Sequence, residues 1–180
     1  MNYRLIPELD GANHEPEPYI LLREIRDMHH GDTRQAHIGL AWQLGIKPDK
    51  DGRIMLGRCI KCSDLNREFA DYDFIITLNK IVWDDPEFDK KKKLALLDHE
   101  MCHAAPNYDD ETGEQKMDER NRLLYRKRAH TIEEFTEIVE RHGCYKRDLE
   151  CFAEALFKKR EPSLFPPPPP KGKKAEVAVQ

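Results

Sequence analysis

The stretch ALLDHEMCHAAP, residues 95–106, places two histidines four positions apart, with a glutamate directly after the first. On an α-helix, residues i and i+4 project from the same side, so His99 and His103 could bind one metal ion. Glu100 is rotated by one residue and could reach a metal-bound water without binding the metal. The stretch therefore predicts a helix with a metal site on one side, although a helix with two solvated or packed histidines is an alternative.

The residues around this stretch favour a long helix. Asp85 can cap its start, Pro86 suits the first turn, and Glu87 favours the positive end of the helix dipole. We predict a helix from about 85 to 104, ending near Pro106. One apolar stripe along it should face the core, formed by Leu94, Leu97, Met101 and Ala104.

Three segments before this helix read as strands, because apolar residues alternate with small or polar ones: 38–44, about 53–61 and 72–79. KPDKDGR contains Pro48 and Asp51-Gly52 and should turn the chain into the second of them. Apolar spacing predicts further helices at 18–30, 117–128, 132–141 and 146–159. The expected fold class is α+β: a small three-stranded sheet packed on the active-site helix, with further helices in the C-terminal part.

The chain divides by composition into three parts. Residues 1–15 read as a loosely structured N-terminal arm, and residues 16–160 as one domain. Residues 161–180 contain five consecutive prolines, which favour polyproline II and exclude a packed core, so we expect a disordered tail there.

Bulk properties exclude several classes of function. Of the 180 residues, 39% are apolar and 36% charged, and the net charge of -4 gives no general case for binding nucleic acid or membranes. The longest apolar runs, such as FIITL, are far too short to cross a bilayer, and the N-terminus lacks the apolar core of a signal peptide. Five irregularly spaced cysteines suit a reducing, cytoplasmic compartment.

The chemistry expected of such a site is peptide hydrolysis. Zinc lowers the pKa of a bound water to about 7, and Glu100 would take the water's proton and pass it to the leaving amine. A catalytic zinc needs three protein ligands, so one must come from elsewhere. His130, in RAHTIEEF, is our first candidate, and Glu134 the second, although Thr131 with Glu134 also fits a capping box. Further candidates are Glu133, His142 and the acidic residues of the 109–111 loop, and Glu133 or Glu134 could instead orient His130.

A resemblance to known proteins narrows the class of metal-dependent enzyme that the sequence predicts. LLDHEMCHA after YDFIITLN is similar to a minimal zincin, and the pattern LGRCIKCSDLNREFADYDFIITLN…LLDHEMCHA…RAHTIEEFTEIVERHGCYKRDL resembles the putative phage metallopeptidase family. The resemblance implies a zincin-like, zinc-dependent peptidase encoded by phages or prophages, which would act on protein or peptide substrates in the host bacterial cytoplasm. The alternatives are a zinc-binding interaction module that does not cleave, and a metalloprotease acting on DNA-bound proteins.

The cysteines read as structural. Cys59 and Cys62 resemble half of a zinc ribbon, but no second pair follows them, and packing is the simpler interpretation. We expect Cys102, inside the histidine motif, to pack as well.

Overall fold

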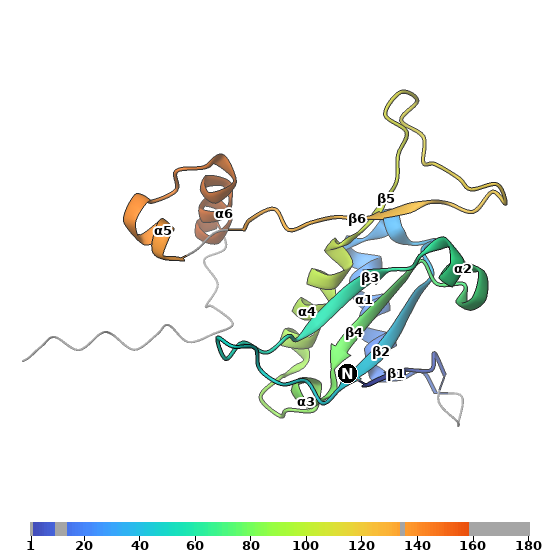
Figure 1. Ribbon diagram of the computed structural model, residues 1–180, viewed down its shortest axis with the longest axis horizontal. Coiled ribbons are helices and arrows are strands. Elements are labelled where there is room, and N and C mark those ends of the chain that lie inside the picture. The colour runs from blue at the N-terminus through green and yellow to red at the C-terminus, as the bar shows by residue number, and fades with distance from the viewer. Residues whose placement is uncertain (1, 10–13, 134–135, 159–180) are drawn as a thin grey trace, which may run out of the picture. The chain divides into compact units, whose positions relative to one another are not determined.

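The computed structural model describes residues 2–9, 14–133 and 136–158, and Figure 1 draws the remainder in grey. The chain divides into two compact units, residues 1–130 and 131–180. The first unit is α+β, as predicted, and holds the sheet and the histidine motif. The domain bounds of 16–160 stay a prediction, and the proline-rich tail lies outside the described residues.

The first unit is built on a four-stranded mixed sheet in the order β1-β2-β4-β3. Its strands are β1 (Asn2–Leu5), β2 (Ile38–Leu44), β3 (Gly57–Lys61) and β4 (Phe74–Asn79). β2 and β4 run parallel in the middle, and β1 and β3 pair antiparallel at the two edges. The prediction of three strands and a loose arm was wrong, because residues 2–5 form a strand. All four of its side chains are exposed, so the burial of side chains does not alternate along this strand as it does in a half-buried one.

The turn predicted in KPDKDGR forms, but the strands on either side of it do not pair. Gly52 adopts a positive φ of 78°, and its N–H donates to the carbonyl of Asp49 at 3.1 Å. β3 begins only at Gly57 and pairs with β4, which lies between β2 and β3. The apolar sequence of β4 suits this interior position, and its Phe74, Ile76 and Leu78 are completely buried.

Two helices, α1 (Glu17–His29) and α4 (Lys90–Cys102), lie on the same face of the sheet (Figure 1). Both contribute to one apolar core, to which α4 gives the fully buried Leu97 and Met101. The predicted start of α4 at Asp85 was five residues early. The Asp85 carboxylate accepts the N–H of Glu87 in a separate turn, and Asp89 caps the helix by accepting the N–H of Lys92 at 2.9 Å.

The helix predicted at 117–128 was also wrong, because this segment forms a short turn and then the second strand of a β-hairpin. β5 (Ala104–Pro106) pairs antiparallel with β6 (Tyr125–Lys127), and between them two isolated bridges, Tyr108 with Gln115 and Met117 with Leu123, each close a shorter turn. The Asp118 carboxylate accepts the N–H groups of Arg120 and Arg122, each at 2.9 Å. This side chain therefore stabilises a turn where apolar spacing favoured a helix.

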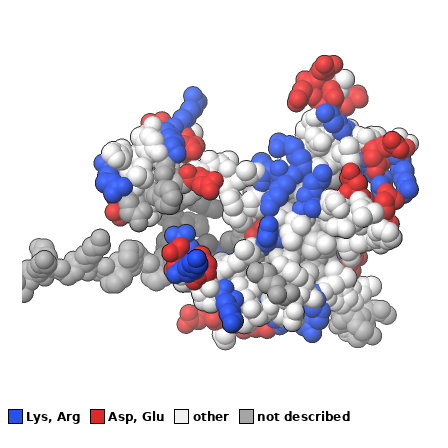
Figure 2. All heavy atoms as spheres, viewed as in Figure 1, with Lys and Arg blue, Asp and Glu red and all other residues white. Residues whose placement is uncertain are grey.

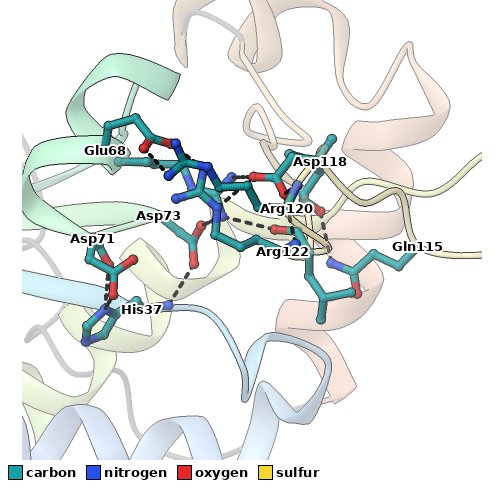
Figure 3. Close-up of polar contacts among 11 residues, drawn as sticks. His37, Glu68, Asp71, Asp73, Gln115, Asp118, Arg120 and Arg122 are labelled. Atoms are coloured by element: carbon teal, nitrogen blue, oxygen red, sulfur yellow. Dashed lines mark hydrogen bonds and ion pairs between the residues drawn. The ribbon is translucent and has the colours of Figure 1, made fainter.

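An ion-pair network holds the hairpin against the rest of the unit (Figure 3). Arg67 lies on α2 (Asp64–Ala70), a helix that the sequence reading missed, and its buried guanidinium contacts Asp73 at 2.7 Å. The same guanidinium donates to the carbonyl oxygen of Leu123 at 3.2 Å. Arg122 adds an ion pair with Glu68 at 2.6 Å. The returning arm of the hairpin is thereby fixed before it reaches β6.

Smaller elements complete the description. A short helix, α3 (Lys80–Trp83), follows β4 and is capped by the Asn79 side chain. In the second unit, α5 (Thr136–His142) and α6 (Arg147–Lys158) lie close to the helices predicted at 132–141 and 146–159. α5 ends at His142 and is followed by Gly143, which has a φ of 67°. No helix in the described ranges is both long and apolar enough to cross a membrane.

Candidate metal centre

Three histidine side chains meet in the first unit. His99 lies in the last turn of α4, His103 is the C-cap of that helix, and His130 follows β6 by three residues. One ring nitrogen from each can be chosen so that all three atoms lie within 4.8 Å of one another. The ring centroids are separated by 4.5 to 5.2 Å.

The spacing of these nitrogens fits a shared ion. The Nε2 atoms of His99 and His130 are 3.1 Å apart. Two ligands at about 2.0–2.1 Å from a tetrahedral zinc are separated by about 3.3 Å, so little movement would be needed. The three imidazoles are therefore a chemically suitable donor set for zinc, and a water would supply the fourth ligand.

The hairpin explains how a residue 27 positions after His103 returns to it. The N–H of Arg128 donates to the carbonyl of His103 at 2.8 Å, one residue beyond the paired part of β6. The Arg128 side chain also donates to the carbonyl of Cys102 at 2.9 Å. These bonds hold Arg128, two residues before His130, against the end of α4.

A third contact with Arg128 sets the tautomer of His103. Its Nδ1 atom lies 2.7 Å from the carbonyl oxygen of Arg128, which can only accept a hydrogen bond. Nδ1 therefore carries the proton, and the deprotonated Nε2 is left to bind a metal. Burial, together with the charge of His103, lowers the pKa of His99 below its usual value, which favours the neutral form that a metal requires.

Glu100 lies beside this cluster on α4 and is only 4% exposed. Burial raises the pKa of its carboxyl, while a backbone hydrogen bond from Cys59 and the nearby His103 and His130 act in the opposite direction. A carboxyl with a raised pKa is a stronger base than an exposed glutamate, which suits a group that takes a proton from water.

Sequence reasoning missed Gly57, where β3 passes Glu100. A Cβ atom at Gly57 would lie 3.1 Å from Oε1 of Glu100 and 3.2 Å from the carbonyl oxygen of Thr77. The absence of a side chain thus permits the close approach of strand and carboxylate. A glycine at the start of an otherwise alternating strand is the signal that could have indicated it.

The other predicted ligands are placed elsewhere. Glu133 and His142 are exposed residues of the second unit, and Glu134 lies outside the described residues. In the 109–111 loop, the Asp109 carboxylate accepts the N–H groups of Glu111 and Thr112 at 3.0 and 3.1 Å. Within the described part of the first unit, the structure thus brings His130 to the motif and leaves Asp109 in its own turn.

The paired cysteines pack, as expected, and both are buried. Burial raises the pKa of the Cys59 thiol to about 12. The sulfur therefore keeps its proton at neutral pH, whereas metals bind the thiolate. In the described ranges, neither thiol belongs to a group of three possible metal ligands. Cys102, by contrast, is exposed, so the expectation that it packs was wrong.

The fold and site define an α+β protein with a helix-borne histidine cluster beside a buried carboxylate. A family model described as putative phage metallopeptidase matches residues 13–157, most of the chain, and the protein belongs to this family. No curated protein and no solved structure gives a significant match.

Proposed function

We propose that the protein is a zincin-like, zinc-dependent peptidase in which His99, His103 and His130 bind the metal and Glu100 is the general base. The convergence of three histidine nitrogens within 4.8 Å is the observation that carries this proposal. Membership of a metallopeptidase family supports it, because the family description implies a metal ion and peptide hydrolysis.

Zinc, when bound, would polarise the scissile carbonyl and acidify a water. Glu100 would accept the water's proton and later deliver it to the leaving amine. Its burial beside β3 keeps bulk water from solvating the carboxylate, and the backbone hydrogen bond from Cys59 helps to hold it in place. The Arg128 carbonyl keeps His103 in its metal-binding tautomer throughout.

The substrate would be an extended peptide lying along β3. This strand is at one edge of the described sheet, and it passes directly over Glu100 at Gly57. An edge strand can pair with an added strand through its backbone, as resemblance to zincins suggests. Three exposed apolar residues, Ile54, Met55 and Leu56, precede it and could contact apolar substrate side chains.

The charge around this edge favours some substrates over others. β3 and β6 carry exposed basic side chains (Arg58, Lys61, Arg126 and Lys127). Figure 2 shows a group of Lys and Arg side chains on the face that carries β3 and β6. Acidic segments should therefore be cleaved faster than basic ones.

We also infer that the protein acts in a reducing cytoplasm, since all five cysteines are free.

The test compares the wild type with Glu100→Gln and with Glu114→Gln, an exposed control on the hairpin, by zinc content and by cleavage of a mixed peptide library. We expect all three to bind zinc and Glu100→Gln to cleave roughly 10²–10⁴-fold more slowly. Equal cleavage by Glu100→Gln would refute the mechanism. Zinc binding without cleavage by the wild type would favour the interaction module.

A further inference from the structure

A second group of possible metal ligands lies on a different side of α4. The ligand atoms of His30, Asp98 and Cys102 all lie within 4.8 Å of one another. The Nε2 atom of His30 is 2.7 Å from Oδ1 of Asp98. We propose that these three side chains form a second metal site, for zinc or a similar divalent transition metal, that joins the end of α1 to α4.

α4 presents two pairs of donors with the same spacing. Asp98 and Cys102 are four residues apart, as are His99 and His103, and the pairs are offset by one residue. One residue corresponds to about 100° around a helix, so the two pairs face different directions. Cys102 can therefore contribute to an ion on the α1 side without displacing a histidine from the first centre.

His30 is held in place for this role by the end of α1. Its backbone N–H donates to the carbonyl of Arg26 at 3.0 Å, which makes it the C-cap of the helix. Its carbonyl accepts both the backbone N–H and the hydroxyl of Thr33, at 3.1 and 3.0 Å. The side chain itself is 10% exposed. A ligand fixed in this way loses little conformational entropy when a metal binds.

The donor chemistry suits a borderline metal. Imidazole nitrogen, thiolate sulfur and carboxylate oxygen are all zinc ligands, and together with one water they complete a tetrahedron. Asp98 and a Cys102 thiolate contribute two negative charges, which balance a divalent ion. The His30 ring side is buried, whereas Cys102 is exposed and the Asp98 side chain is 41% exposed, so an ion can enter from solvent.

The competing account is a hydrogen bond alone, with His30 and Asp98 as a metal-free pair and Cys102 as a neighbouring thiol. A bound zinc would replace this bond, and the two atoms, now 2.7 Å apart, would separate by about 0.6 Å to reach a ligand spacing of about 3.3 Å. Such a movement is available to Asp98, which is partly exposed.

Cobalt titration separates the two accounts, because a thiolate bound to Co²⁺ gives a charge-transfer band in the near ultraviolet that three histidines cannot give. The metal-free protein is titrated with Co²⁺ as the wild type, Cys102→Ser, Asp98→Asn and Cys151→Ser, an exposed thiol of α6 as control. We expect two bound equivalents and the thiolate band in the wild type and Cys151→Ser. Cys102→Ser should lose the band and one equivalent, and Asp98→Asn should weaken binding at this site.

A His130→Ala variant makes this result independent of the proposed peptidase. If the second site exists, the thiolate band persists when the first centre is disabled. Absence of the band from the wild type at two equivalents of Co²⁺, or its survival in Cys102→Ser, would overturn the proposal. Zinc should also protect Cys102 from alkylation in the wild type but leave Cys151 reactive, since a metal-bound thiolate is a poor nucleophile. Equal labelling of Cys102 with and without zinc would count against the site.

Discussion

The Nδ1 atom of His103 lies 2.7 Å from the carbonyl oxygen of Arg128, and the backbone of Arg128 donates in return to the carbonyl of His103. This reciprocal pair joins the end of the motif helix to the strand that returns from the hairpin. It orients one histidine ligand and, two residues later, delivers another. Placement of His130 thus depends on hydrogen bonds between Arg128 and the end of α4, in which the His103 ring itself takes part.

His130→Ala should remove the equivalent of zinc that the histidine cluster holds, because two helical histidines and water hold the ion too weakly. His142→Ala is the matched control, an exposed histidine of the second unit, and should retain the full complement. Metal analysis after dialysis measures the difference. Full zinc in His130→Ala would show that another residue completes the site.

Gly57→Ala should slow peptide cleavage while leaving zinc bound. The added methyl would lie 3.1 Å from Oε1 of Glu100, so either the carboxylate or β3 must shift. A displaced general base costs roughly tenfold to hundredfold in rate. Gly31→Ala is the control, since its Cβ would meet nothing within 4 Å. Unchanged kcat/KM in Gly57→Ala would mean that the approach of β3 does not position Glu100.

Asp118 should make the hairpin sensitive to acid. Hydrogen bonds, first from the Arg122 backbone and then from its side chain, lower the pKa of this carboxyl from 3.8 to about 2. A pKa that is lower in the folded state gives stability that is present above about pH 4 and lost as the pH falls toward 2. The wild type should therefore melt above Asp118→Asn at pH 5, and the gap should narrow by pH 2.5.

Asp110→Asn, an exposed change in the same hairpin, supplies the baseline for that comparison. Its melting temperature should differ from the wild type by a small amount that does not vary between pH 5 and 2.5. A gap for Asp118→Asn that stays constant with pH would show that the turn does not depend on the ionised carboxylate.

Alkylation should discriminate sharply among the cysteines. Burial raises the pKa of Cys59 to about 12, so almost none of it is thiolate at pH 8, and its sulfur is also inaccessible. Cys151 is exposed and should react at least about 100-fold faster in the folded protein. Mass spectrometry of timed iodoacetamide labelling gives both rates. Similar rates would indicate that β3 opens readily at this edge.

Sequence patterns predicted the parts of the fold whose signals are local. The motif helix was recognisable because its apolar stripe and its two histidines follow helical spacing, and Leu97 and Met101 are indeed buried. β2 and β4 were recognisable from their alternation. His130 was a plausible candidate from residue type and local context, although nothing in the sequence specified how the chain returns to it.

The missed features depend on contacts between distant residues. β1 is exposed along its length and exists as a strand because it pairs with β2. The 117–128 segment has helical apolar spacing, but Asp118 binds the backbone of a turn and Arg67 binds the carbonyl of Leu123. Gly57 matters only because α4 brings Glu100 to it. The turn at Asp118 is local, whereas the partners of β1, Arg67 and Gly57 lie too far away in the sequence for a local pattern to reveal them.

The paired strands β5 and β6 have a consequence for recognising distant relatives. The chain leaves the metal centre at His103, and Arg128 returns to it through one backbone hydrogen bond and one from the His103 ring, so the intervening excursion ends where it began. Residues could be inserted or deleted at the exposed tip, 110–114, without moving either end. The number of residues between His103 and His130 is then a poor criterion for finding related sequences. A profile that fixes the helix motif and an Arg-x-His element after a strand, with variable spacing between them, should find homologues that a fixed gap would exclude.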